Sequence, residues 1–518
     1  MGLVTLKNLL EESFDAVGFD RNTYIGGLWK YTDAHTTSVL RTTRVNVSRE
    51  RCCFTDYPFR ECTGSYPTAE EVQTYLEDYA EEFGLLKRCR LGVVVEEVRR
   101  DEARATWIVR TKECGEEKVQ EFDKVVVCSG SNAIPIMPRL GGQQCFQGRI
   151  MHSVAFKEPE DFHGQKVLLV GLGNTAADIA NSLVSVSDKI WLSHRTGGIV
   201  LPRTLPDGTS LDHNTSYRKM SIFDTLEQYV PSLAQWALMK FIHGVQSKIW
   251  VMKPEWRLDP APTPSHKLFI VSDDLISNLE SGNVSSVAGV KRIKDAQTVE
   301  LEDGQVVDPD TIILCTGFRI DYSVLGSHDP TRHDLTANAG HSPLPVLYRN
   351  LFSLDHPDSL ACMGAIVYMA PAFEIFDLAS MAIAQLWKAE RGQRSPRFPP
   401  QHEMLDQVKC HLSFMRSLLA KGAGNPRWVR GYEWLAWIQD VIGCRLDEHL
   451  SPWSWQAWTF WWEDRELSNL MTRGIPSPHF HRVFDGQGRR KRWPGARSAI
   501  VKMNEEVKSG RTNTSKLK

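Results

Sequence analysis

Hydrophobic and polar positions along the chain predict helices and strands in alternation. Residues 1–13 have apolar side chains at helical spacing, and "FDAVGF" (14–19) is typical of a short strand. The segment 68–85 repeats the helical period between acidic faces. From 91 to 128 the pattern predicts a small β-meander that leads into one buried strand. This alternation of elements predicts an α/β fold.

The middle of the chain contains a second strand–turn–helix unit. Residues 164–184 have the pattern of a strand, a glycine turn and a helix, and 188–195 that of the next strand. The stretch 309–322 predicts another buried strand, which ends in Cys-Thr-Gly as the strand of the 120s ends in Cys-Ser-Gly. The Pro-rich residues 253–267 cannot form a helix or a central strand and are expected to be a loop.

A Pro/Arg-rich linker at 391–402 precedes a C-terminal region of helical pattern that continues to residue 502. The polar residues 503–518 are expected to be disordered. Within the helical region, 451–466 is rich in tryptophan. These side chains spread over more than half of a helical circumference, so we expect burial against a domain in preference to a membrane-interface helix.

Length and composition exclude several classes of function. With 518 residues the chain exceeds one hydrophobic core, and two or three domains are expected. The net charge of −2 gives no reason to expect a nucleic-acid partner, so a small molecule is the expected one. The 11 cysteines include no pair at metal-ligand spacing, which predicts no metal site and reduced thiols.

The sequence predicts a soluble, cytoplasmic protein. Its N-terminus has no charged-then-apolar leader, and the longest apolar stretch, 360–373, is too short to cross a bilayer. Peripheral membrane association and the oligomeric state are left open.

The motif Gly171-Leu-Gly173-Asn-Thr-Ala176 follows an apolar strand and opens a helix. The first glycine permits a tight turn, the second lets a pyrophosphate approach the backbone, and the alanine allows close helix–strand packing. The free N–H groups of the helix N-terminus suit the phosphates. A dinucleotide site is therefore predicted here, with contacts from Gly171, Gly173, Asn174, Thr175, Ala176, Ala177 and Asp178.

The residues that end the following strand favour NADPH. An NAD site would place a carboxylate there, whereas this chain has Ser193, Arg195 and Thr196, whose hydroxyls and guanidinium suit a 2′-phosphate. A solvated surface arginine is the alternative.

The N-terminal residues predict a second, incomplete dinucleotide unit. Gly2 begins a helix, and Asp20 ends the next strand at the spacing expected between a glycine loop and its ribose-binding acid. Gly2 would be the third glycine, and the strand and first two glycines would lie upstream. A mis-assigned start of the chain is the expected explanation. After Asp20 and Arg21, the Gly26-Gly27 pair allows close approach to a flat ligand, and Trp29 adds an aromatic wall.

These motifs resemble the flavin-containing monooxygenases. The resemblance rests on Asp20, "IGGLW" (25–29), "CSG" (128–130), "CTG" (315–317), "GLGNTA" (171–176) and above all the string 146–157. In that string Phe146, Gly148, His152, Phe156 and Lys157 match the family's F-x-G-x-x-x-H-x-x-x-[FY]-[KR] fingerprint. The tail 478–500 further resembles fungal members.

The resemblance implies two Rossmann-like domains: a discontinuous FAD domain (1–157 and 310–390), an inserted NADPH domain (158–309) and a helical C-terminal extension (391–502). It further implies FAD contacts from Gly2, Asp20, Arg21, Gly26, Gly27, Leu28, Trp29, Val95, Ser129, Gly130, Thr316 and Gly317. Asn46 matches the family's active-site asparagine. Val45 stands where the family commonly has threonine, which puts the local geometry in doubt. His152 is expected to be structural and to couple the domains.

The implied activity is that of an NADPH-dependent monooxygenase. A C4a-hydroperoxyflavin formed with O2 would oxygenate nitrogen or sulfur, or carbon, of a small organic molecule, plausibly in secondary-metabolite biosynthesis. A Baeyer–Villiger enzyme is one alternative, which Phe156 and Lys157 disfavour. A non-catalytic NADPH-binding protein that has lost FAD is the other.

Overall fold

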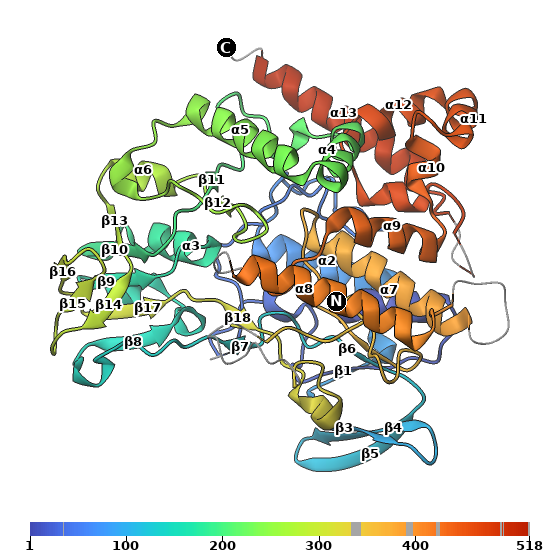
Figure 1. Cartoon of the computed structure of the whole chain (residues 1–518), viewed down its shortest axis with the longest axis horizontal. Coiled ribbons are helices and arrows are strands. Elements are labelled where there is room, and N and C mark those ends of the chain that lie inside the picture. The colour runs from blue at the N-terminus through green and yellow to red at the C-terminus, as the bar shows by residue number, and fades with distance from the viewer. Residues whose placement is uncertain are drawn as a thin grey trace.

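The largest sheet has five parallel strands in the order β13–β10–β9–β17–β8 (Figure 1). Their bounds are β8 Arg149–His152, β9 Lys166–Val170, β10 Lys189–His194, β13 Val284–Ala288 and β17 Thr311–Leu314. In this computed structural model of the chain, the described residues are 1–34, 36–332, 343–389, 397–420, 425–486, 489 and 492–515, without the side chains of 389 and 510–515. Half of the predicted linker 391–402, residues 391–396, lies outside them.

Successive side chains of β9 face opposite layers of the inserted unit. Val167 and Leu169 pack in the core under α3 (Asn174–Leu183) and α6 (Leu275–Glu280), whereas Leu168 packs against a small antiparallel sheet. That sheet consists of β14 (Val290–Ile293), β15 (Val299–Leu301) and β16 (Val306–Val307). Burial on both faces explains why these strands are apolar runs without alternation.

The largest sheet includes strands on both sides of the predicted inserted unit, 158–309. The fingerprint segment supplies the edge strand β8, and β17 lies between β8 and β9. The sheet therefore extends from residue 149 to residue 314. Further helices and short strands complete the unit: α4 Tyr217–Tyr229, α5 Pro231–Ile249, β11 Val200–Leu201 and β12 Ile270–Val271.

The other unit contains two pairs of parallel strands. β1 (Gly18–Asp20) pairs with β2 (Cys89–Leu91), and β6 (Val125–Val127) pairs with β19 (Leu360–Cys362). Among the described residues β1 and β6 share no hydrogen-bonded ladder. The helix α1 (Gly2–Glu11) contacts both sides, because Cys128, just after β6, lies against Thr5 and β1 follows α1 directly. The helix α7 (Ala372–Ala389) packs on α1.

The predicted meander and surface helix are confirmed. The meander is β3 (Val93–Asp101), β4 (Thr106–Glu113) and β5 (Glu116–Phe122), all antiparallel. The helix is α2 (Ala69–Glu82), which starts with a capping box between Thr68 and Glu71. A short antiparallel pair, β7 (Ile134–Pro135) with β18 (Phe318–Arg319), lies at the boundary of the two units.

The C-terminal region is helical, as predicted, and its described helices are α8 Gln401–Leu419, α9 Gly431–Ile442, α10 Leu446–Leu450, α11 Trp455–Glu463, α12 Arg465–Arg473 and α13 Ala496–Ser515. The prediction of disorder from 503 is wrong as far as residue 515, because α13 continues through it (Figure 1). Met503 and Val507 are buried with Ile475, and this packing stabilises the helix where the local sequence is polar.

The predicted burial of the tryptophan-rich segment is also wrong. Trp453, Trp455 and Trp462 are 93%, 81% and 78% exposed, whereas Phe460 is the buried residue of α11. Phe460 packs edge-on against Phe484, with the ring centroids 5.0 Å apart, and this contact holds one face of the short helix against the protein.

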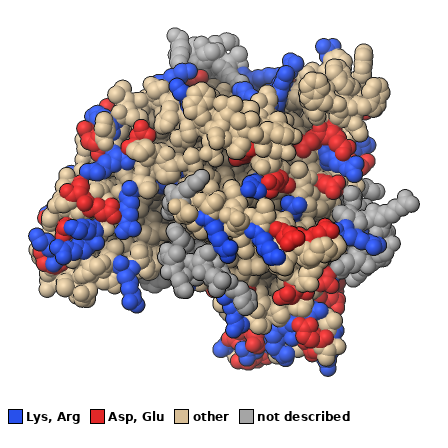
Figure 2. Space-filling model, in the orientation of Figure 1, with Lys and Arg blue, Asp and Glu red and all other residues tan. Residues whose placement is uncertain are grey.

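The described helices include none long and apolar enough to cross a membrane. Acidic and basic side chains are interspersed over the visible face, in keeping with the small net charge (Figure 2).

Candidate active site

The glycine loop after β9 uses its glycines in two different ways. Gly171 has φ +118°, and a Cβ there would lie 2.5 Å from the carbonyl oxygen of Cys315, so the packing of β9 against β17 requires glycine. Gly173 faces open space, since a Cβ there would have no atom within 4 Å. The protein does not need glycine at this second position, whereas a pyrophosphate approaching the backbone does.

Of the remaining loop residues, Ala176 and Ala177 are fully buried and Thr175 is exposed at the start of α3. Asn174 is committed to the fold: its amide oxygen accepts from Val271 N–H (2.8 Å) and its amide nitrogen donates to Phe269 O (3.3 Å). Its predicted cofactor contact is therefore limited to the backbone. Burial raises the pKa of Asp178 to about 6, although the charge of Arg203 opposes this shift.

The predicted 2′-phosphate residues divide into one buried and two exposed side chains. Ser193 is buried and its hydroxyl donates to Ala288 O (2.8 Å), so it is not available to a phosphate. Arg195 is on the surface, where it pairs with Glu302 at 3.0 Å, and Thr196 is exposed beside it.

A second cation near this loop escaped sequence reasoning. The Lys267 ammonium donates to Gly197 O (3.0 Å) and has no carboxylate partner among the described residues. It lies 3.4 Å from the Cβ position of Gly198, which also contacts Leu172 of the glycine loop. Burial lowers the pKa of Lys267 to about 8. Lys267 lies in the Pro-rich loop, 70 residues from Gly197, so no local sequence pattern links it to the glycine loop.

Gly2 and Asp20 lie together at the end of α1. A Cβ on Gly2 would meet only the Cβ of Cys128 at 3.8 Å, an ordinary contact. Asp20 accepts a hydrogen bond from Asn22 N–H (2.9 Å), and burial, partly offset by this bond, raises the pKa of its carboxyl group. Asp20 and Cys128 both act electrostatically on the Met1 amino group, whose pKa is lowered by burial. The α1 N-terminus thus lies between the ends of β1 and β6. Arg21 next to it is exposed.

The Gly26-Gly27 turn, like the loop after β9, has one glycine that the packing requires and one whose side is open. Gly26 has φ +103°, and a Cβ there would lie 1.9 Å from the Gln73 side chain of α2. Gly27 has φ +58° and an open side. Leu28 and Trp29 are half-buried, and Trp29 packs beside the core under α2. The turn therefore offers a free backbone face next to an aromatic side chain.

The two Cys-x-Gly turns also end in open glycines. Gly130 (φ +98°) and Gly317 (φ +84°) would each place a Cβ in open space. The Ser129 hydroxyl donates to Asp321 O (3.0 Å) and the Thr316 hydroxyl to Ile136 O (2.6 Å), so both side chains fasten the turns. Val95, the expected adenine contact, is half-buried at an irregularity of the β3–β4 ladder.

The fingerprint residues connect the two units. His152 is buried; its Nδ1 accepts from Val154 N–H (3.2 Å), so its Nε2–H donates to Gly317 O (3.0 Å). Lys157 donates to Thr36 O (3.2 Å) and the Ser38 hydroxyl (3.1 Å). The His152 bond joins the ends of the neighbouring strands β8 and β17, whereas the Lys157 bonds reach the loop at 36–38 of the other unit. The domain-coupling role of His152 therefore stays a prediction.

The other fingerprint residues pack. Gly148 has no room for a side chain, because a Cβ would lie 2.4 Å from Asp310 O and 2.6 Å from the Phe146 ring. Phe146 itself is partly buried against the small sheet β14–β16, and Phe156 is buried and stacks on Phe162 at 5.2 Å.

Asn46 reaches the boundary between the two units. Its amide oxygen accepts a hydrogen bond from Arg203 of the inserted unit (2.9 Å). Arg203 is buried and also donates to Val45 O (3.1 Å), while Asp273 pairs with its other edge at 3.2 Å. The amide nitrogen of Asn46 makes no hydrogen bond within the described residues, and the side chain is exposed. A fixed oxygen with a free N–H donor is the arrangement that can orient a ligand.

The segment around Asn46 is held by further bonds to the inserted unit. Ser48 N–H donates to Asp212 (2.8 Å), and His213 lies 3.2 Å from the buried Glu50. Val45, where the family pattern has threonine, is buried in the α2 core. Apolar packing and the Arg203 contact therefore fix this backbone without a hydroxyl. Sequence reasoning missed Arg203 and Asp212, because nothing local links them to Asn46.

Comparison with known proteins places the chain in a family. The model of the family described as "Flavin-binding monooxygenase-like" matches residues 1–515, and the chain belongs to this family. Monooxygenase aurF of Gibberella zeae is 44% identical over 514 residues, covering 98% of this chain and 96% of that protein. Flavin-containing monooxygenase 3 of Oryctolagus cuniculus is 27% identical over 511 residues, covering 96% of this chain and 89% of that protein.

Solved structures share the fold. S-allyl-L-cysteine S-oxygenase from Allium sativum superposes with a TM-score of 0.63 at 21% identity, over 98% of this chain and 96% of its own. Cyclohexanone monooxygenase bound to ε-caprolactone gives a TM-score of 0.60 at 19% identity, over 85% of this chain and 95% of its own. The predicted α/β architecture with Rossmann-type domains is therefore confirmed.

Proposed function

We propose that the protein is an FAD- and NADPH-dependent monooxygenase that oxygenates nitrogen or sulfur of a small organic molecule. The observation that carries this proposal is the contact between Asn46 and Arg203. It holds an exposed amide at the boundary between two units, each of which has open glycine turns. A substrate and a nicotinamide would meet a flavin at such a boundary.

The residues present fit NADPH and the ribose and flavin parts of FAD. Gly173 and the α3 N-terminus would receive the NADPH pyrophosphate, with Lys267 and Arg195 as the cations nearest to its phosphates. Gly27, Gly130 and Gly317 would receive FAD with their open backbone faces, and Asp20 would bind its ribose. Bound FAD, reduced by NADPH, would supply the activation of O2.

The protein contributes orientation and exclusion of water. Arg203 fixes the Asn46 oxygen. The free amide N–H can then donate to a flavin carbonyl or to the nicotinamide without a change in the Asn46 side chain. Lys157 would hold the two units in register through the loop at 36–38, and His152 would fix the end of β17 through Gly317. Closure of this boundary would keep water from the reacting atoms.

The test begins with an absorbance spectrum of purified protein supplied with FAD. Bound oxidised flavin would give near-ultraviolet and blue bands, and their absence would favour the alternative of a protein that has lost FAD. NADPH oxidation and O2 uptake are then measured with amine and sulfide panels, and N- or S-oxides are identified by mass spectrometry. Esters formed from ketones, without N- or S-oxides, would instead identify a Baeyer–Villiger enzyme.

A matched pair of variants tests the nucleotide assignment. Gly173→Asp places a carboxylate where the pyrophosphate should bind, so we expect flavin binding to persist and NADPH oxidation to be lost. Gly244→Asp, at an open glycine of α5, should retain both. Equal NADPH oxidation by the two variants would contradict the proposal.

A further inference from the structure

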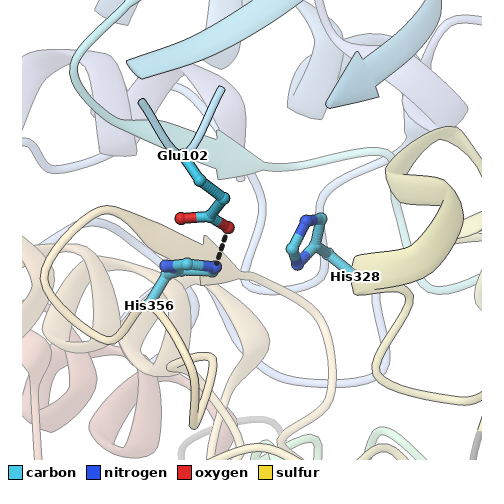
Figure 3. A group of neighbouring side chains, drawn as sticks. All are labelled: Glu102, His328 and His356. Atoms are coloured by element: carbon cyan, nitrogen blue, oxygen red, sulfur yellow. Dashed lines mark ion pairs between the residues drawn. The ribbon is translucent and has the colours of Figure 1, made fainter. Parts of the chain in front are cut away.

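Two histidines and a glutamate converge away from the cofactor motifs (Figure 3). Glu102 lies in the turn between β3 and β4, His328 ends the 3₁₀ helix η8 (Ser323–His328), and His356 precedes β19. One nitrogen of each ring and one oxygen of the carboxylate all lie within 4.8 Å of one another. Glu102 thus comes from a segment more than 200 residues before the two histidines, and the three side chains point toward one another.

We propose that Glu102, His328 and His356 form a binding site for one divalent transition-metal ion, for which Zn²⁺ is the best-suited candidate. Imidazole nitrogen and carboxylate oxygen are both ordinary zinc ligands. Three protein ligands leave a fourth position for water. Asp355, which acts electrostatically on His328 and adjoins His356 in the chain, is a second carboxylate within reach of the site.

The spacing fits a metal better than a hydrogen bond. Zinc bonds of about 2.0–2.2 Å at tetrahedral angles place two ligand atoms about 3.4 Å apart. The Nε2 of His356 lies 3.5 Å from the Glu102 oxygen, which is that separation and is long for a charged hydrogen bond. The three ligand atoms are at most 4.8 Å apart, so the set would have to contract by no more than about 1.4 Å to reach that separation.

The backbone is held in place at two of the three ligands. Asp101 accepts from Ala103 N–H (3.1 Å) and Arg104 N–H (3.2 Å), which fixes the turn carrying Glu102. Ser353 accepts from His356 N–H (3.3 Å), and Leu360 N–H donates to His356 O (2.8 Å). A site whose ligands are positioned in advance loses little entropy on binding the ion.

Both histidine rings pack edge-on against the buried Trp107, with ring centroids 5.2 Å and 5.4 Å from that of the indole. That packing accounts for the ring positions, but it gives no role to Glu102, whose side chain is 70% exposed and still lies against His356.

The ion would have a structural role. It would fasten the β3–β4–β5 sheet, which carries Val95, to η8 and to the segment that leads into β19. Glu102 would then be joined at one point to two segments that lie more than 200 residues further along the chain. This inference does not depend on the proposed function.

The experiment uses full-length protein, first treated with chelator and then dialysed against ZnCl₂, with bound zinc counted by elemental analysis. We expect one tightly bound zinc per chain in the wild type. His328→Gln and His356→Gln should each weaken binding by about 100-fold and Glu102→Gln by about tenfold. Zinc should raise the melting temperature of the wild type by more than that of any of these three variants. Co²⁺ should give the visible absorption bands of a tetrahedral site.

His163→Gln, at an exposed histidine outside the cluster, is the matched control and should bind zinc like the wild type. Glu102→Gln keeps the test decisive if a histidine variant folds poorly, because its exposed side chain supports no packing. Zinc affinity that is unchanged in Glu102→Gln and in a correctly folded His328→Gln protein would overturn the proposal.

Discussion

Asn46 shows how one residue acquires its role from a distant partner. Its amide is exposed, yet Arg203, 157 residues further along the chain, holds the oxygen at 2.9 Å and leaves the N–H group free. Arg203 is itself fixed by Val45 O and Asp273. The orientation of the amide is therefore set before any ligand binds, which is what electrostatic preorganisation requires.

Asn46→Ala should lower the rate of product formation by about 100-fold, because it removes one preorganised donor. Folding should be unaffected, since the side chain is exposed. Flavin absorbance and NADPH affinity should stay close to those of the wild type, while more of the consumed O2 appears as hydrogen peroxide. Asn283→Ala, at an exposed asparagine before β13, is the control. A wild-type yield of oxygenated product from Asn46→Ala would show that this amide has no part in the reaction.

At the scale of an element, the loop between β9 and α3 contains one glycine that the fold requires and another that a ligand would require. Gly171 is required by close packing against Cys315 and by its positive φ, whereas Gly173 has an extended backbone (φ −146°) and an open side. One motif thus contains a structural glycine and a binding glycine, two residues apart.

Alanine substitutions should distinguish the two. Gly171→Ala should lower the free energy of unfolding by about 2–3 kcal/mol, through left-handed strain and the clash with Cys315. Gly173→Ala should change it by less than about 0.5 kcal/mol but raise the KM for NADPH about tenfold, because the methyl group separates the backbone from the pyrophosphate. Urea unfolding and steady-state kinetics measure these effects. A large stability loss in Gly173→Ala with an unchanged KM would contradict the assignment.

Elements with strong local periodicity could be predicted from the sequence. Which elements lie side by side in the fold could not. The helix α2 and the meander β3–β5 follow from alternating residues, and the glycine loop from its own spacing. The insertion of β17 between β8 and β9 depends on long-range pairing that no local pattern records. The exposed tryptophans of α11 and the helical tail were missed for a related reason: burial depends on partners such as Ile475, which lies outside the segment.

The site residues divide in the same way. Gly173 and Gly27 belong to motifs whose role can be predicted from the sequence alone. In the structure a Cβ at either position would meet no atom within 4 Å. Ser193 looked available as a hydroxyl but faces into the sheet, and Lys267 and Arg203 are brought to the site only by the fold. The linear sequence pattern does not show in which direction a side chain points or which distant residues the fold brings next to it.

Across the whole molecule, the C-terminal segment is joined to the N-terminal unit by buried charges. The 3₁₀ helix η10 (Pro478–Arg482) bonds to both α1 and α7. Arg482 is 1% exposed and pairs with Glu11 at 3.1 Å and Asp56 at 3.0 Å. His481 lies 2.9 Å from Glu374 of α7. Removing one partner of such a buried pair leaves an uncompensated charge, so the fold of the two ends is coupled.

This coupling predicts a pH dependence of stability. Burial alone would lower the pKa of His481, but its hydrogen bonds with Cys444 and Glu374 outweigh burial and raise the pKa to about 9. The folded protein therefore holds this proton more tightly than the unfolded chain, whose histidine has a pKa of about 6.5. The stabilisation is fully present below about pH 6.5 and is lost as the pH rises through about 9. The difference corresponds to about 3 kcal/mol of unfolding free energy.

His481→Gln should remove this dependence, because the amide can still donate to Glu374 but does not titrate. Urea unfolding at about pH 6 and about pH 9.5 should show a loss of stability in the wild type that is smaller by about 3 kcal/mol in the variant. His479→Gln is the control within the same 3₁₀ helix. Burial lowers the pKa of His479, so its contribution is lost only as the pH falls below its ordinary value, and the alkaline slope should remain that of the wild type. Parallel alkaline slopes in all three proteins would mean that the His481–Glu374 pair does not couple the C-terminal segment to α7.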